Sequence, residues 1–153
     1  MRYTVYLSIM YHKRKFIPLF PEKYAGDPTN IIMRSSWETK FAIWCDKNPA
    51  IVKWHSEETV VPYVSPIDNR MHRYFIDFKV KVLDKNGALK EYLVEIKPFN
   101  QTMPPIPQQR KTQRFLKEVQ TWGVNDAKWK AARNYAKQRG QEFIILTEKE
   151  LGI

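Results

Sequence analysis

Residues 73–97 are the stretch of this chain that decides the predicted fold. They read RYFIDFKVKVLDKNGALKEYLVEIK, and apolar side chains alternate with polar ones on both sides of the turn sequence Lys85-Asn86-Gly87. Alternation with a period of two residues is typical of a half-buried strand. An Asn-Gly pair between two such runs favours a hairpin turn. The stretch therefore predicts an antiparallel hairpin made of strands 73–83 and 89–97.

Three polar residues of this hairpin, Asp77, Glu95 and Lys97, share the face opposite the apolar one. The apolar face carries Tyr74, Ile76, Phe78, Val80 and Val82 on the first strand, and Tyr92, Val94 and Ile96 on the second. If the loop is residues 85–87, paired residue numbers sum to 172, so Asp77 pairs with Glu95. Directly paired side chains have Cβ atoms about 4.5–5.5 Å apart. We therefore expect the two carboxylates to lie side by side.

Two carboxylates at that separation repel each other unless a cation lies between them. Carboxylate oxygens are ligands that suit Mg²⁺. Lys97 adds an ammonium that can activate water or neutralise a phosphate. Phosphodiester hydrolysis uses a metal ion that activates water and a cation that stabilises the developing charge. The alternatives are an exposed strand face for Asp77 and an ordinary surface ion pair of Glu95 with Lys97, since Asp…Glu-x-Lys also occurs by chance.

A helix is predicted upstream of the hairpin, from Ser36 to Asn48, where Asn48-Pro49 ends it. Ser35 and Glu38 have capping-box spacing. The predicted buried face carries Trp37, Phe41, Trp44 and Cys45, which fall at i, i+4, i+7 and i+8. Glu38 therefore has two interpretations. It is the capping partner of Ser35, or it is a third carboxylate of the site if this helix packs beside the hairpin.

A proline-broken loop at 101–107 follows the hairpin, and two helices are predicted after it. The first runs from Gln108 to Trp122, and Asn125 then caps a second helix that extends to Arg139. The inward face of the second helix carries Trp129, Ala132 and Ala136. A short buried strand at 143–146 completes the order. Short strands are also predicted at 51–54 and 59–64. This order predicts an α/β (α+β) fold, a sheet flanked by helices.

Composition favours a nucleic-acid partner. The chain has 153 residues, 43% of them hydrophobic, which suits one compact domain. Its formal net charge is +10, and such a surface attracts polyanions. Cys45 is the single cysteine, so an intrachain disulfide is excluded and a zinc site of the usual spacing is not indicated. Residues 1–10 lack the ordered regions of a signal peptide, and no apolar run is long enough to span a membrane.

The order of Glu38, Asp77 and Glu95-Ile96-Lys97 resembles the core of the PD-(D/E)xK nuclease superfamily. The spacing is similar to the TnsA-type endonuclease branch, and closer still to the head completion nucleases of T-even-like bacteriophages. The resemblance covers roughly residues 20–150. The stretches that carry it are Tyr24–Pro28, Arg34–Glu38, Asp46–Pro49, Trp54–Glu57, Arg73–Asp77, Glu95–Pro98, Val124–Ala132 and Ile145–Glu148. Ile76 stands where the literal motif has proline.

This resemblance implies a restriction-endonuclease-like core, a central mixed β-sheet with an antiparallel hairpin flanked by helices. It implies residues 1–33 as an N-terminal arm that wraps the core and residues 34–153 as the nuclease domain. The implied catalytic residues are Glu38, Asp77, Glu95 and Lys97. Asp77 and Glu95 would bind Mg²⁺, for which Mn²⁺ can substitute. Glu57 and Gln113 are candidate secondary members of the site.

DNA contacts are expected from two groups of basic residues, Arg34 and Arg73 upstream, and Arg110, Lys111 and Arg114 at the predicted start of a helix. The helix-borne group would hold the phosphate backbone. The alternative for that group is a solvated helix face.

The resemblance also implies a biological setting. The substrate would be double-stranded DNA in packaged phage heads, and the step would be a late one, before tail attachment. Partners would be head, portal or neck proteins, in the host cytoplasm during assembly or in the virion, with no membrane; a dimer is compatible with this setting. Two other functions stay open. One is a structural virion protein that binds DNA ends or plugs the portal without catalysis. The other is a transposon- or junction-type endonuclease of the same fold.

Overall fold

The structure is a computed structural model that describes residues 13–153. Its elements, in chain order, are β1 (Arg14–Phe16), η1 (Pro21–Lys23), β2 (Ile31–Met33), α2 (Ser36–Lys47), β3 (Ile51–Ser56), β4 (Val60–Val64), β5 (Met71–Phe75), β6 (Phe78–Leu83), β7 (Leu89–Ile96), η2 (Phe99–Gln101), α3 (Gln113–Gln138), β8 (Glu142–Leu146) and α4 (Glu148–Leu151). The first twelve residues of the predicted arm lie outside the described part. None of the described helices combines the length and the apolar character that crossing a membrane requires.

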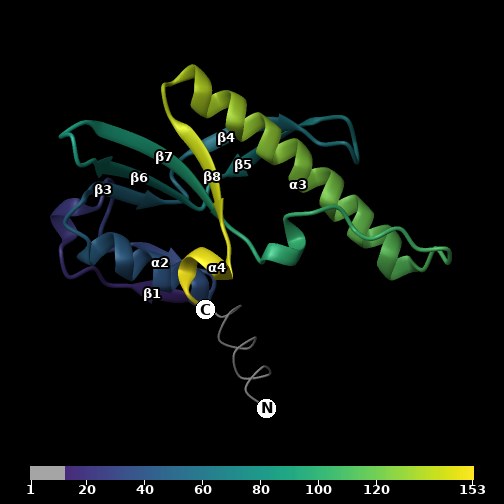
Figure 1. Ribbon diagram of the computed structural model, residues 1–153, viewed down its shortest axis with the longest axis horizontal. Coiled ribbons are helices and arrows are strands. Elements are labelled where there is room, and N and C mark those ends of the chain that lie inside the picture. The colour runs from purple at the N-terminus through teal and green to yellow at the C-terminus, as the bar shows by residue number, and fades with distance from the viewer. Residues whose placement is uncertain (1–12) are drawn as a thin grey trace, which may run out of the picture.

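A four-stranded mixed sheet with the order β3-β6-β7-β8 forms the centre of the fold. The first two pairings are antiparallel and β7 pairs with β8 in parallel. Helices α2 and α4 lie on one side of this sheet and α3 crosses the other side (Figure 1). Each face has its own core, because neighbouring residues of one strand point to opposite faces. Val94 packs on the α2 side, and Leu93 packs on the α3 side with Trp129. The predicted fold class is confirmed.

The hairpin of β6 and β7 has the predicted register. Phe78 pairs with Val94 and Leu83 pairs with Leu89, so paired numbers sum to 172. The backbone N–H of Asp84 donates to the carbonyl of Ala88 at 2.8 Å. Gly87 lies in the left-handed region with φ 80°, a conformation that glycine adopts without a Cβ penalty. Loop length and turn chemistry together fixed this register.

The predicted single strand 73–83 is wrong, because the chain changes sheets at Ile76-Asp77. Strand β5 pairs with β4 in a separate two-stranded sheet, and β6 pairs with β3 and β7. At the switch, the Ile76 N–H donates to the carbonyl of Thr59 at 2.9 Å. The apolar alternation continues through the switch, but Tyr74 and Ile76 pack on the α3 side and Phe78 and Val80 on the α2 side. Asp77 therefore lies just outside β6 rather than within a strand.

The two helices predicted between 108 and 139 are one continuous helix, α3, of 26 residues. It begins later than predicted, where the Thr112 side chain accepts from the N–H of Phe115 at 3.1 Å. Asn125 is a buried residue in the middle of the helix and caps nothing. The predicted inward face is confirmed: Trp129, Ala132 and Ala136 are buried. Arg110 and Lys111 precede the helix, so the prediction that they lie at its start together with Arg114 is wrong.

Helix α2 begins as predicted, because the Ser35 hydroxyl accepts from the Glu38 N–H at 3.1 Å. Its buried face includes Trp37, Phe41 and Cys45, but Trp44 is 48% exposed, against the prediction. The centre of the buried face is displaced toward Ala42, which is fully buried. Trp44 lies at the edge of that face and stacks on Phe41, with ring centroids 5.5 Å apart.

Residues 14–33 pack closely on α2 and the central sheet. Phe16, Tyr24, Ile31 and Met33 are buried in the core on the α2 side. The Lys23 ammonium donates to the carbonyls of Cys45, Asp46 and Asn48, at 2.7, 2.9 and 2.8 Å. A cation at this place stabilises the C-terminus of a helix. The division of the chain at residue 33 stays a prediction.

Candidate active site

Glu38, Asp77, Glu95 and Lys97 come from three parts of the fold. Glu38 lies in the first turn of α2, Asp77 at the switch from β5 to β6, and Glu95 near the end of β7, two residues before Lys97. The Asp77 carboxylate accepts a hydrogen bond through Oδ2 from the N–H of Ile96, at 2.8 Å. This bond places Asp77 against the end of β7. The sheet switch therefore keeps the neighbourhood that the hairpin register predicts.

Glu95 is the most enclosed member of the set. It is 6% exposed, and its two oxygens have different partners. Oε1 lies 3.4 Å from Nζ of Lys97, and Oε2 accepts a hydrogen bond of 2.5 Å from the Tyr74 hydroxyl. Tyr74 belongs to β5, in the other sheet. Sequence analysis assigned Tyr74 only to the apolar face. A buried tyrosine usually needs a hydrogen-bond partner for its hydroxyl, and this need is the signal in the sequence that could have identified Tyr74 as a neighbour of the site.

The carboxylates of the site affect one another electrostatically. Burial raises the pKa of Asp77 well above its usual range, and the charges of Glu95 and Glu38 raise it further. The Ile96 N–H and Lys97 act in the opposite direction on the Asp77 pKa. Burial also raises the pKa of Glu38, against the effect of Arg34, with Glu95 adding to the rise. Glu38 therefore faces the same site as the hairpin carboxylates.

Glu38 combines parts of both interpretations that the sequence leaves open. The Glu38 N–H donates to the Ser35 hydroxyl, but the Glu38 carboxylate does not accept from the Ser35 N–H. Oε2 of Glu38 instead accepts from the backbone N–H of Arg34 at 3.1 Å. The predicted capping box is therefore incomplete, because the Glu38 carboxylate accepts from the N–H of Arg34 and not from that of Ser35. The charges of Glu95 and Lys97 affect the pKa of Glu38, so this carboxylate lies within electrostatic range of both, and its membership of the site stays a prediction.

The donor atoms fit a hard divalent cation, because they are carboxylate oxygens and the negative charges of Glu95 and Glu38 raise the pKa of Asp77. A positive ion between them would favour their ionised forms. Within residues 13–153, no three His, Cys, Asp or Glu side chains converge as a ready-made metal cage. Mg²⁺ usually binds through one or two carboxylates and completes its shell with water and phosphate oxygens. Asp77 and Glu95 match that pattern, and their role as metal ligands stays a prediction.

The predicted DNA contacts form two groups on the surface. Arg34 forms an ion pair with Glu57, and the guanidinium of Arg73 lies 5.7 Å from the ring centroid of Phe75. Arg34, Glu57 and Phe75 line one shallow cavity, so these residues are neighbours. The N–H of Glu57 donates to the carbonyl of Asp77 at 3.2 Å, which places Glu57 beside the acidic site.

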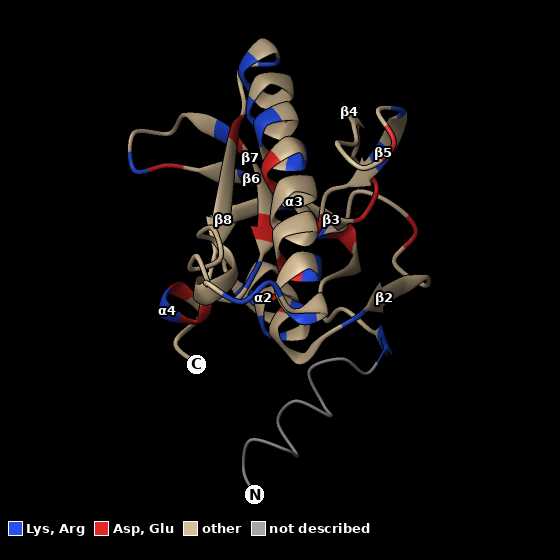
Figure 2. Cartoon of the chain, turned by 90° about the vertical axis from the view of Figure 1, so that its right-hand side faces the viewer, with Lys and Arg blue, Asp and Glu red and all other residues tan. Residues whose placement is uncertain are grey.

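The second group lies at the start of α3. Figure 2 shows Lys and Arg along this helix and in the chain that leads into it. Arg110 and Lys111 stand in that chain, and the Lys111 ammonium lies 5.5 Å from the ring centroid of Phe115. Arg114 is highly exposed and lies 3.3 Å from the Glu118 carboxylate. Gln113, the first residue of α3, is exposed. Whether these residues bind DNA stays a prediction.

A mixed sheet flanked by helices, with an acidic pair and a lysine at one end of its hairpin, defines a nuclease-like class of protein. Residues 48–148 match the sequence family described as TnsA-like endonuclease N terminal, and the chain belongs to this family. The chain is also 43% identical over 146 residues to the head completion nuclease of Enterobacteria phage T4, across 93% of this chain and 95% of that protein. No solved structure matches the chain.

These comparisons confirm the resemblance and support a nuclease role. The family match includes Asp77, Glu95 and Lys97, and it begins after Glu38. The three hairpin residues are therefore inside the segment that defines the family, whereas Glu38 rests on the geometry of α2 and on the longer match to the phage relative.

Proposed function

We propose that the chain is a Mg²⁺-dependent DNA nuclease that cuts within DNA or trims its ends. The observation that carries this proposal is the meeting of Asp77, Glu95 and Lys97 at the end of β7, with Glu38 facing them from α2. An acidic pair, of which Glu95 is buried and Asp77 half-buried, beside a lysine has the components that phosphodiester hydrolysis needs. The net charge of +10 supports a polyanionic substrate.

Asp77 and Glu95 would hold Mg²⁺, with Mn²⁺ as a substitute, and a bound ion would polarise the phosphate and lower the pKa of a water. The Ile96 N–H fixes Oδ2 of Asp77, and the Tyr74 hydroxyl fixes Oε2 of Glu95. Each carboxylate is thus oriented before substrate binds. The Lys97 ammonium orients the attacking water or stabilises negative charge on the phosphate. Glu38, whose pKa burial raises, would support the metal or accept a proton from its water.

The name of the phage relative supports a more specific role. That protein is described as a head completion nuclease. By this likeness, we place the chain at a late step of phage head completion, acting on packaged double-stranded DNA before tail attachment. Its partners would then be head, portal or neck proteins, and it would act in the host cytoplasm during assembly or within the virion.

The test uses the purified chain with supercoiled, linear and branched DNA, each with Mg²⁺, with Mn²⁺ and with chelator. We expect cleavage with either metal and none with chelator. Equal cleavage of supercoiled and linear DNA would support a general nuclease. Selective cleavage of branched DNA would favour the junction-type endonuclease instead. Lack of cleavage under every condition, by a protein that is folded, would contradict the proposal.

A structural role in binding DNA ends or plugging the portal is the second candidate. The observation in its favour is the net charge of +10, which attracts DNA whether or not the chain cleaves it. Infection by phage that carry Lys97→Ala separates the two candidates, since a plug needs no Lys97 ammonium. Full infectivity of Lys97→Ala phage would support the plug, and loss of infectivity with normal protein abundance would support the nuclease.

A further inference from the structure

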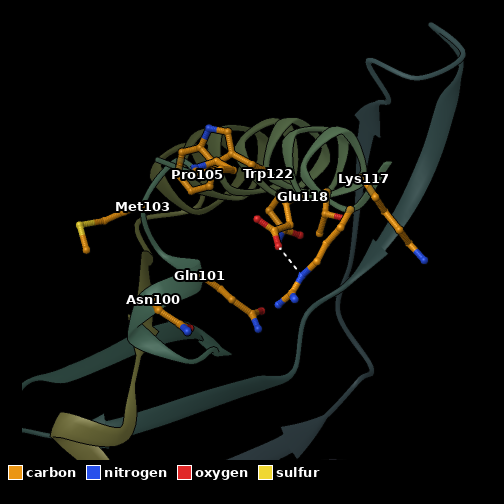
Figure 3. Close-up of a pocket in the computed structure, with 10 residues that line it drawn as sticks. Asn100, Gln101, Met103, Pro105, Lys117, Glu118 and Trp122 are labelled. Atoms are coloured by element: carbon orange, nitrogen blue, oxygen red, sulfur yellow. Dashed lines mark hydrogen bonds and ion pairs between the residues drawn. The ribbon is translucent and has the colours of Figure 1, made fainter. Parts of the chain in front are cut away.

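A second concave site lies beside the acidic one and has no assigned role. It is a cavity of about 520 Å³ between the segment after β7 and the N-terminal half of α3. Figure 3 shows Asn100 and Gln101 on one wall, from η2, and Glu118 and Trp122 on the other, from the helix. Pockets that bind small molecules usually have volumes of about 300–1,000 Å³. The cavity is therefore large enough for a ligand.

The two walls connect directly to the acidic site. Asn100 follows Lys97 by three residues, and the N–H of Phe99 donates to the Glu148 carboxylate at 2.9 Å, which fixes this segment. On the other wall, Trp122 contacts Trp129, with ring centroids 5.9 Å apart. Trp129 and Tyr74 belong to one buried cluster, and Tyr74 is the hydrogen-bond partner of Glu95.

The separation between the two sites suits one DNA strand. Asn100 in the cavity wall is three residues from Lys97, and an extended chain spans at most about 3.6 Å per residue, so their Cα atoms lie within about 11 Å of each other. Successive nucleotides of a duplex strand rise about 3.4 Å each. A strand whose phosphate lies at the acidic site would therefore have its next few nucleotides beside the cavity.

The lining has the chemistry that recognises a nucleobase. Asn100, Gln101 and Asn125 carry amides that both donate and accept hydrogen bonds. Glu118 can accept from an exocyclic amino group, and Trp122 supplies an aromatic wall. Asn125 is buried, so its amide group has a fixed place. Lys117, which also lines the cavity, is exposed, so its ammonium can meet the phosphate backbone (Figure 3).

Bases inside an intact duplex have their pairing edges occupied and their faces stacked. Groove edges of paired bases stay open to amides and carboxylates, but a base can lay its face against the Trp122 wall of this cavity only when it is unpaired and out of the stack. We propose that the cavity binds an unpaired nucleobase next to the cleaved phosphate, so that the preferred substrate is DNA with unpaired nucleotides at an end or a break. This inference rests on the proposed nuclease function, because it assigns that nuclease a substrate class.

The test compares two DNA molecules that share one duplex: the blunt form, and the same duplex with two unpaired nucleotides at one end. Binding is measured by fluorescence anisotropy in chelator, so that it does not depend on cleavage. We expect the unpaired nucleotides to increase affinity. Gln101→Ala, at an exposed position of the cavity wall, should lower that preference about three- to tenfold, as expected for one lost hydrogen bond. Thr121→Phe, which fills the cavity from an exposed helix position, should abolish it.

Gln138→Ala is the matched control, because it removes the same amide from an exposed position at the far end of α3. It should leave the preference unchanged. If Gln101→Ala and Thr121→Phe both bind the two DNA molecules as the unchanged protein does, the cavity is not a base site and the inference is overturned, even if the protein cuts DNA. If the preference for unpaired nucleotides and its loss in these variants are found without any cleavage, the cavity assignment stands and the nuclease proposal fails.

Discussion

The hydroxyl of Tyr74 donates a hydrogen bond of 2.5 Å to Oε2 of Glu95, and this bond joins the two sheets at the acidic site. Both residues are buried, at 4% and 6% exposure. Hydroxyl–carboxylate bonds of about 2.5–2.7 Å are charge-assisted and strong. Burial and the charge of Glu95 raise the pKa of Tyr74, so its hydroxyl stays protonated and remains a donor. One oxygen of Glu95 is thus fixed, while the other faces Lys97.

Replacing Tyr74 by phenylalanine tests whether this bond positions Glu95. Tyr74→Phe keeps the ring and removes the donor, so we expect the Mg²⁺ concentration for half-maximal cleavage to rise about 10- to 100-fold. The free energy of unfolding should fall by about 1–3 kcal/mol, because a buried acceptor loses its partner. Tyr63→Phe, at another buried tyrosine on the α3 side, is the control. An unchanged metal requirement in Tyr74→Phe would show that Tyr74 has only a packing role.

Asp77 makes the stability of the metal-free protein depend on pH. Its pKa in the folded chain lies above the ordinary value of 3.8, so the folded chain binds more protons than the unfolded chain. The free energy of unfolding should therefore decrease as pH rises from 3.8 through the raised pKa. Asp77→Asn, which has no charge to bury, should lack this part of the decrease and be more stable than the parent at neutral pH. Chemical denaturation of the parent and of Asp77→Asn across this pH range measures the two free energies of unfolding. Parallel curves for the two proteins would contradict the raised pKa.

Metal binding and protons should compete at the acidic site. The pKa values of Asp77 and Glu38 are both raised, so these groups stay protonated to a higher pH than free carboxyl groups do. We expect cleavage to increase with pH, and the acid limb of the pH–rate profile to move to lower pH as Mg²⁺ concentration increases. Rates at several fixed Mg²⁺ concentrations measure the displacement. An acid limb that stays in place would indicate that neither carboxylate binds the metal.

Lys23 should contribute to the stability of the fold rather than to chemistry. Its ammonium donates to three carbonyls at the end of α2, so Lys23→Met leaves them without this partner. We expect a loss of about 2 kcal/mol in the free energy of unfolding, within the range for a cation at a helix C-terminus. Cleavage per folded molecule should not change. The control is Lys47→Met in the last turn of the same helix. Equal free energies of unfolding for Lys23→Met and Lys47→Met would contradict the role of Lys23 in stabilising the end of α2.

The sequence predicted the hairpin register because loop length and side-chain parity leave one solution. It did not predict the change of sheet at Ile76-Asp77. The apolar alternation runs through that point without a break, and only tertiary pairing of β5 with β4 separates the two strands. Tyr74 was missed as a member of the site for the same reason. In a single strand it would point away from Glu95, and the change of sheet brings it to that carboxylate.

The helical region was misread because local signals resembled a boundary. Gly123 and Asn125 look like an interruption, yet α3 continues through both. Burial of Trp129, Ala132 and Ala136 against the sheet stabilises the helix on the α3 side. Helix propensity and capping signals are weak compared with such packing. The role of Glu38 was also undecided in the sequence, since only the placing of α2 shows which groups its carboxylate faces.

We expect Asp77 and Lys97 to serve catalysis and not folding. The test measures DNA cleavage in Mg²⁺ by Asp77→Ala and by Lys97→Ala. The control is Lys90→Ala, at an exposed position of β7. Thermal unfolding of each variant confirms that it is folded. We predict that Asp77→Ala and Lys97→Ala lose cleavage while remaining folded, and that Lys90→Ala cuts as the parent does. Parental cleavage by both Asp77→Ala and Lys97→Ala would contradict the account.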